Sequence, residues 1–284
     1  IAAADNQEVT ALLQKIYSEP IKEDIVARRV EAIKKAGVIC AISLVPANTK
    51  RLAPVVQEAG CDILFVQSTV TSARHVSKSY RGLIFSELKQ QLKMPIVVGN
   101  CASFTACKEL METGIDGVLI GVGPGAACTS REVLGIGVPQ ITTTIDCAAA
   151  RDTYLEETGR YVPIITDGGF KKGGDVCKAF AAGADAVMIG SPFAQVEGAP
   201  GRGYHWGMSH PHPALPRGTR IKVGTTTTLE KLLLGPTSQT HGTENFAGAL
   251  RIAMGFCGAA TIREMHKAEM VIAPAIVTEG KSYQ

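Results

Sequence analysis

One cysteine of this chain stands in a setting that could make it a nucleophile. Cys128 lies in the segment GVGPGAACTSRE, Gly121 to Glu132, directly after a short apolar run. Three glycines at alternate positions let the backbone curl tightly and turn its amides and carbonyls inward. A thiol is a good nucleophile only as the thiolate, which the nearby Arg131 and the loop amides would favour. A glycine-rich turn with an incidental buried cysteine is an equally good reading of this segment alone.

A second segment offers groups that suit a phosphorylated sugar. It is PIITDGGFKKGGDVCKAFAAGADAVMIGSPFA, Pro163 to Ala194. Asp167 would end a strand and give a carboxylate for ribose hydroxyls, and the two glycines after it give amides free of side-chain bulk. The next strand would end at Gly190 and Ser191, whose amides and hydroxyl can hold a phosphate. Many unrelated barrel enzymes share such phosphate geometry, so this segment alone leaves the function open.

The elements that must position these groups repeat one pattern of a short β-branched run, a polar loop and a longer amphipathic segment. The predicted strands are Val38 to Leu44, Asp62 to Val66, Pro95 to Gly99, Gly117 to Gly121, Pro163 to Thr166 and Ala186 to Gly190, with PQITTT from Pro139 as a weak extra one. The predicted helices are Thr49 to Ala59, Leu83 to Leu92, Ser103 to Thr113, Ala148 to Glu157 and Asp175 to Ala182. Nearly all-apolar strands suit a parallel sheet that is buried on both faces.

Strict alternation of strands and helices predicts an α/β chain, and a (β/α)8 TIM barrel in particular. The segment up to Gly37 reads as two helices and supplies no strand. Since a closed barrel needs about eight strands, we expect the first two to be absent from the chain as given. We expect a single catalytic barrel domain over residues 1–284, with a mobile loop or flap region at about 195–243.

Composition limits the partners and the compartment. The formal net charge is +3 with scattered Lys and Arg, which argues against nucleic acid or an acidic membrane but allows a small anion. The eight cysteines lack the spacing of a disulfide scaffold or a zinc ribbon and indicate a reducing compartment. No apolar run approaches the roughly 20 residues that span a bilayer, and no signal peptide is recognisable. We therefore expect a cytoplasmic protein.

The cysteine segment resembles the catalytic loop of the IMP dehydrogenase and GMP reductase family. That loop has the pattern Gly-x-Gly-x-Gly-x-x-Cys-Thr/x-Ser/Thr-Arg, which Gly121 to Arg131 matches, and GIGVPQITT, Gly135 to Thr143, also resembles the family. The resemblance extends from about Gly37 to Ala275. It implies that Cys128 attacks C2 of a purine nucleotide and that the hydroxyl of Ser130 lies beside it.

The resemblance also implies the residues that bind the substrate. Asn100 in VVGNCAS matches a Gly-Asn pair of the family, and HWGMS, His205 to Ser209, resembles a segment that contacts base and phosphate. The implied substrate-binding residues are Asn100, Asp167, Gly168, Gly169, Gly190, Ser191, Gly207 and Met208. Since the family usually has Tyr at the position of His205, we interpret this His as a structural hydrogen bonder rather than a titrating catalyst.

Two cofactors, NAD and potassium, follow from the same resemblance. The loop VQSTVTSARH, Val66 to His75, occupies the place where dehydrogenases have DSS or DTA for the nicotinamide cofactor. Gln67 replaces that Asp, and Ser68 and Thr69 follow it. The residues implied for potassium, through their backbone carbonyls, are Gly123, Gly125 and Cys128.

The flap departs from the family pattern. Dehydrogenases carry an Arg-Tyr pair that activates water, whereas this chain continues after GMS with HPHPALPRGTRIKVG. GMP reductases have a Glu near this point, where the chain has Arg217. We hypothesise that Arg217 or Arg220, or one of His210 and His212, activates water, although arginine has a high free pKa. A solvated proline-rich loop is the alternative.

Three functions are compatible with these residues. The first is IMP dehydrogenase, which oxidises IMP to XMP with NAD through a covalent thioimidate on the cysteine. The second is GMP reductase with NADPH, favoured by the short flap and by IDCAAA, Ile145 to Ala150, and disfavoured by the missing Glu. The third is a purine nucleotide sensor without turnover, against which Cys128 argues.

Within the family, the chain resembles most the IMP dehydrogenase-related proteins of cyanobacteria and actinobacteria. These proteins lack the paired regulatory CBS modules, and this chain has no insertion of that size. The resemblance implies a homotetramer or homo-octamer that binds a nucleotide of the IMP, XMP or GMP type.

Overall fold

The computed structural model describes residues 1–74, 82–207 and 220–271. At its centre is a parallel sheet of six strands in the order β1-β2-β3-β4-β5-β6. The strands are β1 (Ala41–Leu44), β2 (Ile63–Gln67), β3 (Ile96–Cys101), β4 (Gly117–Ile120), β5 (Ile164–Asp167) and β6 (Ala186–Met188). Each lies at a predicted strand. The first begins later than predicted, because Val38 and Ile39 are 56% and 74% exposed.

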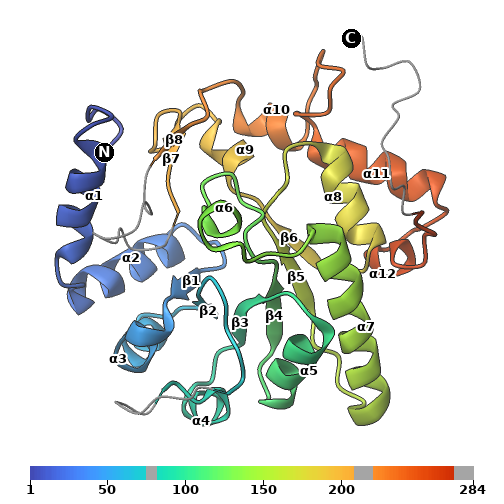
Figure 1. Ribbon diagram of the computed structural model, residues 1–284, viewed down its shortest axis with the longest axis horizontal. Helices are drawn as coiled ribbons and strands as arrows, with labels where there is room; N and C mark the ends of the chain where they lie inside the picture. The colour runs from blue at the N-terminus through green and yellow to red at the C-terminus, as the bar shows by residue number, and fades with distance from the viewer. Residues whose placement is uncertain (75–81, 208–219, 272–284) are drawn as a thin grey trace.

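Helices connect the successive strands and pack around the outside of the curved sheet (Figure 1). They are α3 (Pro46–Glu58), α4 (Phe85–Gln91), α5 (Phe104–Glu112), α7 (Gln140–Thr158) and α8 (Gly173–Ala181). Gly60, Gly114 and Gly183 follow three of these helices with φ of +95°, +89° and +106°, as expected for left-handed residues that close helices. The described residues therefore form an α/β half-barrel of the TIM-barrel type, which confirms the predicted fold class.

The core lies between the sheet and its helices. Every residue of β3 and β4 is buried. Helices cover the outer face of these strands, and their other face points into the concave side of the curved sheet. Large aliphatic side chains such as Leu52, Leu64 and Leu110 are fully buried, and each contributes about 1.5–3 kcal/mol by leaving water. A Cβ on Gly99 would lie 2.3 Å from Leu119 O, so this position of β3 requires glycine.

The predicted weak strand from Pro139 is wrong. Helix α7 begins at Gln140 and includes the β-branched run that suggested a strand. Thr143 and Thr144 are fully buried against the sheet, and Thr144 Oγ1 lies 3.1 Å from Thr166 Oγ1 on β5. Packing against the sheet thus outweighs the weak helix propensity of threonine.

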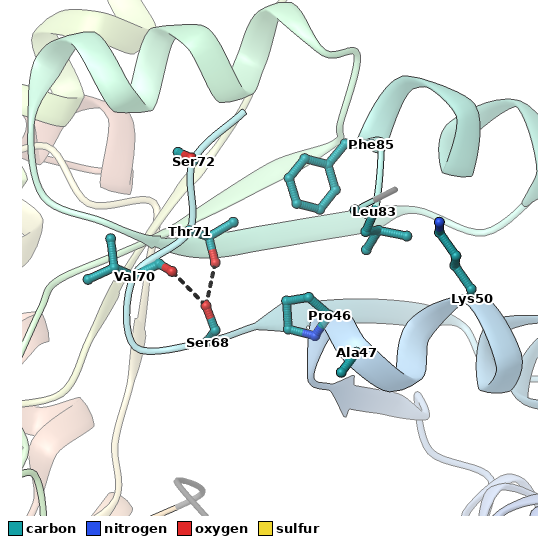
Figure 2. A pocket seen from close by; sticks show the side chains of 10 residues that line it. Pro46, Ala47, Lys50, Ser68, Val70, Thr71, Ser72, Leu83 and Phe85 are labelled. Atoms are coloured by element: carbon teal, nitrogen blue, oxygen red, sulfur yellow. Dashed lines mark hydrogen bonds between the residues drawn. The ribbon is translucent and has the colours of Figure 1, made fainter. Parts of the chain in front are cut away.

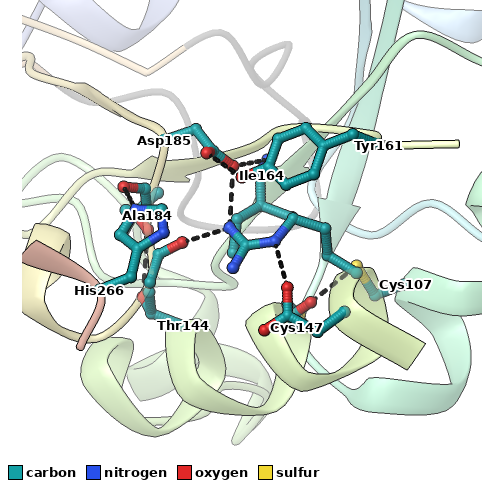
Figure 3. Close-up of polar contacts among 12 residues, drawn as sticks. Cys107, Thr144, Cys147, Tyr161, Ile164, Ala184, Asp185 and His266 are labelled. Atoms are coloured by element: carbon teal, nitrogen blue, oxygen red, sulfur yellow. Dashed lines mark hydrogen bonds and ion pairs between the residues drawn. The ribbon is translucent and has the colours of Figure 1, made fainter. Parts of the chain in front are cut away.

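A buried ion pair fixes α7 to the starting ends of β5 and β6 (Figure 3). Arg151 Nη1 donates to Asp185 Oδ2 at 3.0 Å and to Gly183 O at 2.7 Å. Asp185 Oδ2 also accepts from Ile164 N at 2.9 Å, and its other oxygen accepts from the Tyr161 hydroxyl. The arginine side chain is 3% exposed. This network sets the position of α7 relative to the strands that carry the nucleotide-binding candidates.

Further elements lie at both ends of the chain (Figure 1). The two predicted N-terminal helices are present, and a short hairpin and several helices occur beyond β6. These elements are α1 (Val9–Ser18), α2 (Glu23–Lys35), α9 (Ser191–Ala194), β7 (Tyr204–His205), β8 (Ile221–Lys222), α10 (Leu229–Leu233), α11 (Phe246–Phe256) and α12 (Ile262–Met265). The short helix α6 (Ser130–Leu134) lies between β4 and α7. Among the described residues, no helix has both the length and the apolar character needed to cross a bilayer.

Candidate active site

Polar side chains from three strands meet at Asp167, at the carboxyl end of β5. Gln67 Nε2 donates to Asp167 Oδ2 at 2.8 Å, and Asn100 Nδ2 donates to the same oxygen at 2.9 Å. Asn100 Nδ2 also donates to Gly121 O at 2.9 Å. Because parallel strands end at one edge of the sheet, residues far apart in sequence converge. The sequence predicted that Asn100 and Asp167 would share a site, and the structure brings them together.

The carboxylate of Asp167 is held by one oxygen only. Within the described part of the chain, no hydrogen bond reaches Oδ1, so this oxygen can accept from a ligand hydroxyl. Burial raises the pKa of Asp167, and the hydrogen bonds from Asn100 and Gln67 act in the opposite direction. The two amides therefore orient the carboxylate and partly offset the cost of ionising it inside the protein.

The candidate nucleophile lies on the loop between β4 and α6. Cys128 is half-buried, its backbone N donates to Gly125 O at 3.0 Å, and its Sγ donates to Ser130 Oγ at 3.3 Å. Ser130 is 1% exposed and is the first residue of α6. The structure thus pairs the two residues expected to act together. A hydroxyl can accept from the thiol and, after rotation, donate to the thiolate.

The cysteine loop packs on the two glycines that follow Asp167. A Cβ on Gly168 would lie 3.3 Å from Pro124 Cγ, and one on Gly169 would lie 3.2 Å from Pro124 Cβ. Both glycines have φ of +86°, a conformation that other residues rarely adopt. This close packing places the thiol loop beside the candidate ribose site.

Arg131 braces the loop rather than facing the thiol. Its guanidinium donates to Val122 O at 3.3 Å and to Val138 O at 2.6 Å. A Cβ on Gly123 or Gly137 would lie 2.7 or 2.6 Å from the arginine side chain, so these glycines make room for it. We expected Arg131 to favour the thiolate, but the described residues include no hydrogen bond between the two side chains.

The candidate phosphate groups lie beyond the ends of β5 and β6. Gly168 N donates to Met188 O at 3.0 Å, which joins the two strand ends. Ser191 Oγ lies 2.9 Å from His205 Nε2, and burial lowers the pKa of His205. A neutral imidazole that holds a hydroxyl fits the structural role expected for this histidine.

The segment after β7 leads from the phosphate candidates to the cysteine loop. A Cβ on Gly207 would lie 3.8 Å from Ala127 O, so this glycine lies beside the residue that precedes Cys128. The other residue implied here by resemblance, Met208, lies outside the described residues.

A cavity of about 390 Å³ opens beside β2 (Figure 2). Its lining combines the hydroxyls of the loop after β2 with apolar groups of α3 and α4. The lining residues are Pro46, Ala47, Lys50, Ser68, Val70, Thr71, Ser72, Gly82, Leu83 and Phe85. Ser68 Oγ donates to Val70 O and contacts Thr71 Oγ1, both at 2.8 Å. Of the residues implied for the cofactor, Ser68 lines this cavity.

Two other sequence candidates have different surroundings. Gln67 uses its amide nitrogen for Asp167, while its Oε1 accepts from Ser43 Oγ at 3.2 Å. Arg220 donates to Ala2 O at 2.8 Å and to Asn6 Oδ1 at 3.1 Å. Its guanidinium also lies 4.2 Å from the centre of the Tyr204 ring. Arg217, His210 and His212 lie outside the described residues.

Gln140 is a site residue that the sequence analysis missed. Its Nε2 donates to Asp167 O at 3.0 Å and to Ile120 O at 3.3 Å. A Cβ on Gly121 would lie 2.5 Å from this amide, so the glycine gives Gln140 access to the strand ends. Placing a helix start directly after Pro139, the N-cap of α7, would have put the Gln140 amide at the amino end of that helix.

Comparison with known proteins decides the family. A family model described as the IMP dehydrogenase / GMP reductase domain matches residues 12–209. The chain belongs to this family.

Two relatives and one solved structure agree with this assignment. An uncharacterized oxidoreductase of Mycolicibacterium smegmatis is 38% identical over 265 residues, covering 92% of this chain and 71% of that protein. Inosine-5'-monophosphate dehydrogenase of Cryptosporidium parvum is 38% identical over 154 residues, which cover 54% of this chain and 36% of that protein. The crystal structure of an IMP dehydrogenase/GMP reductase-like protein from Corynebacterium glutamicum matches with a TM-score of 0.86 at 37% sequence identity. The match covers 94% of this chain and 70% of that protein. The predicted family is confirmed.

Proposed function

We propose that this protein is an NAD-dependent IMP dehydrogenase in which Cys128 is the nucleophile. The main support is the packing of the Cys128 loop on Gly168 and Gly169, directly after Asp167. A thiol and a carboxylate oxygen that is free to accept a hydroxyl thereby lie on adjoining segments. This arrangement suits a purine ribonucleotide whose ribose binds the carboxylate and whose base meets the sulfur.

In the proposed reaction, the Cys128 thiolate forms a bond to C2 of IMP. The hydrogen at C2 then leaves with its electron pair, which makes the purine a thioimidate on the cysteine. Water adds to C2 and gives up a proton to the activating base, the C–S bond breaks, and XMP leaves as the thiolate returns. Ser130 Oγ, 3.3 Å from the sulfur, donates to the thiolate and lowers the cost of its charge.

Substrate binding in this proposal uses the remaining polar groups around the strand ends. Asp167 Oδ1 accepts from the ribose hydroxyls, and the amides of Gly169 and Gly190 with the Ser191 hydroxyl hold the 5′-phosphate. His205, 2.9 Å from Ser191 Oγ, orients that hydroxyl. A hydrogen bond to a charged group is worth about 1.5–3 kcal/mol, so the carboxylate and the phosphate contacts would dominate affinity.

We propose that the cavity beside β2 holds part of a dinucleotide. Its volume of about 390 Å³ falls in the range of about 300–1,000 Å³ for small-molecule pockets. We propose that Ser68 and Thr71, which line the cavity, hold NAD there, with Thr69 on the same loop. Bound NAD supplies the acceptor for the hydride. Gln67 acts through Asp167, because its amide is already used there.

Potassium fits the described residues poorly. Of the three implied carbonyls on the cysteine loop, that of Gly125 already accepts from Cys128 N. The Arg131 side chain packs against Gly123, and a cation bound beside its guanidinium would be repelled. We therefore derive no step through potassium.

The base that activates water is proposed to be Arg217 or one of His210 and His212. Arg220 is proposed to anchor the N-terminal segment instead, because its guanidinium nitrogens donate to residues 1–6. We also propose a cytoplasmic homotetramer or homo-octamer, which light scattering on the purified protein would test.

The experiment that tests this function follows nicotinamide absorbance with two substrate pairs. IMP with NAD should produce NADH, whereas consumption of NADPH with GMP would establish the second candidate, GMP reductase. The segment Ile145 to Ala150 favours that second candidate. Tight purine binding without turnover in either assay would instead identify a nucleotide sensor.

A further inference from the structure

Three cysteine sulfurs converge between the sheet and two of its helices. Cys101 ends β3, Cys107 lies on α5 and Cys147 lies on α7, and their three Sγ atoms lie within 4.8 Å of one another. The residues are 2%, 0% and 0% exposed. Figure 3 shows Cys107 beside Cys147. Three separate elements thus direct a soft ligand atom to one buried point.

Hydrogen bonding does not account for this convergence. Cys107 Sγ donates to Cys147 O over 3.9 Å, and Cys147 Sγ donates to Ser103 O over 3.8 Å. Thiols are weak donors, and contacts of this length contribute little.

We propose that Cys101, Cys107 and Cys147 form a trigonal binding site for one Cu(I) ion. Thiolate ligands select soft ions such as Cu(I). Metal–sulfur bonds of about 2.3 Å in a trigonal plane separate the sulfurs by about 4.0 Å. The three Sγ atoms of the cluster lie within 4.8 Å of one another, which is compatible with this separation. The described residues add no His, Asp or Glu to the group, whereas structural zinc sites have four ligands.

Binding requires no electron transfer. Copper enters as Cu(I), each thiol that becomes a thiolate releases its proton to solvent, and the copper remains monovalent. Two thiolates, one thiol and Cu(I) leave one negative charge in the core. The N-terminus of α5, which follows Cys101 and is capped by Ser103, offsets part of this charge through its dipole.

The bound ion would join elements that hold the proposed nucleotide site. Cys101 follows Asn100, whose amide donates to Asp167 Oδ2. Cys147 lies on α7, whose first residue, Gln140, donates to Asp167 O. Copper would therefore stabilise the arrangement around Asp167, and the protein should unfold at a higher temperature when loaded.

The test uses Cu(I) alone as the probe, without oxygen, on the full chain with Cys128→Ala to remove the proposed nucleophile. Copper is added to the folded protein and, in parallel, during refolding. We expect one copper per chain after desalting, three sulfur neighbours in X-ray absorption and a raised Tm. Neither nucleotide nor turnover enters this experiment, so its outcome is independent of the proposed function.

Two variants in the same background locate the ion. Cys107→Ser should lose the copper and the rise in Tm. Cys61→Ser should keep both, since Cys61 is also buried and donates to Cys40 O at 3.6 Å but lies outside the cluster. Circular dichroism without copper checks that each variant folds.

Full copper retention by Cys107→Ser would overturn the proposal. So would failure of the Cys128→Ala protein to retain copper by either route. Nitrogen or oxygen neighbours, or fewer than three sulfurs, in the absorption spectrum would overturn it even if the variants did not fold.

Discussion

At the scale of single residues, the orientation of Asp167 governs the proposed recognition of the nucleotide. Two amides hold Oδ2 and leave Oδ1 for a ligand. The spacing of residues predicted a carboxylate at this strand end, but it could not show that Gln67 orients it. Hydrogen bonds between side chains from different strands depend on rotamers that a pattern does not encode.

Replacing Asp167 by Asn should weaken IMP binding. The loss of a hydrogen bond to a charged acceptor costs about 1.5–3 kcal/mol, so Kd should rise by about 10- to 100-fold. Titration calorimetry with IMP alone measures this. Asp24→Asn is the control, because Asp24 lies on α2 and its carboxylate, 69% exposed, pairs with Arg28. Equal affinity of wild type and Asp167→Asn would remove Asp167 from the site.

The pH dependence of kcat/KM should report the raised pKa of the buried Asp167 carboxylate. Burial raises the pKa of Asp167, so the ionised form needed to accept ribose hydroxyls is lost at a higher pH than for an exposed aspartate, whose pKa is about 3.9. We expect kcat/KM for IMP to fall on the acidic side with an apparent pKa above that value.

The contribution of Asp167 to the free energy of unfolding should become more favourable as pH falls, whereas kcat/KM decreases. Because folding raises this pKa, ionised Asp167 destabilises the fold above the folded pKa, and that cost disappears as pH falls through it. Asp167→Asn should lack this component in urea unfolding measured against pH. Identical pH profiles for the two proteins would contradict the raised pKa.

At the scale of loops and helices, Arg131 and Arg151 act as braces. Arg131 lies on α6 and donates to the carbonyl oxygens of Val122 and Val138, so we expect the neighbouring cysteine loop to need no added cation. Turnover of IMP should therefore be the same in sodium as in potassium at equal ionic strength. Loss of activity in sodium would show that the implied potassium site exists.

Replacing Arg151 by Met should destabilise the fold strongly. Asp185 would lose its buried partner, and leaving a buried charge uncompensated costs about 3–5 kcal/mol. Urea unfolding of the variant measures this loss, and adding Asp185→Asn should restore part of it. Arg28→Ala is the matched control, because Arg28 and Asp24 are 68% and 69% exposed and should change stability by less than about 1 kcal/mol.

The start of α7 shows why part of the site escaped sequence reasoning. The run from Gln140 contains isoleucine and three threonines, which local propensity assigns to a strand. Thr143 and Thr144 are fully buried against the sheet, and this packing stabilises a helix there. The error hid Gln140, whose donor position depends on where the helix begins.

At the scale of the whole molecule, alternating apolar runs predicted the six parallel strands and their order, since sequential βα units lie side by side. In the structure, Gly60, Gly114 and Gly183 follow helix ends with left-handed φ values that are costly for other residues. Other long-range contacts were not predictable. The hydrogen bonds of Arg220 to the first residues of the chain join segments that no local pattern relates.

The central claim is that the sulfur of Cys128 bonds to the purine. The most direct measurement is to quench the protein during turnover of IMP with NAD and to map the modified peptide by mass spectrometry. The account predicts a purine nucleotide adduct on Cys128, with neither adduct nor turnover in Cys128→Ala. Continued turnover in that variant, or an adduct on a different residue, would contradict it.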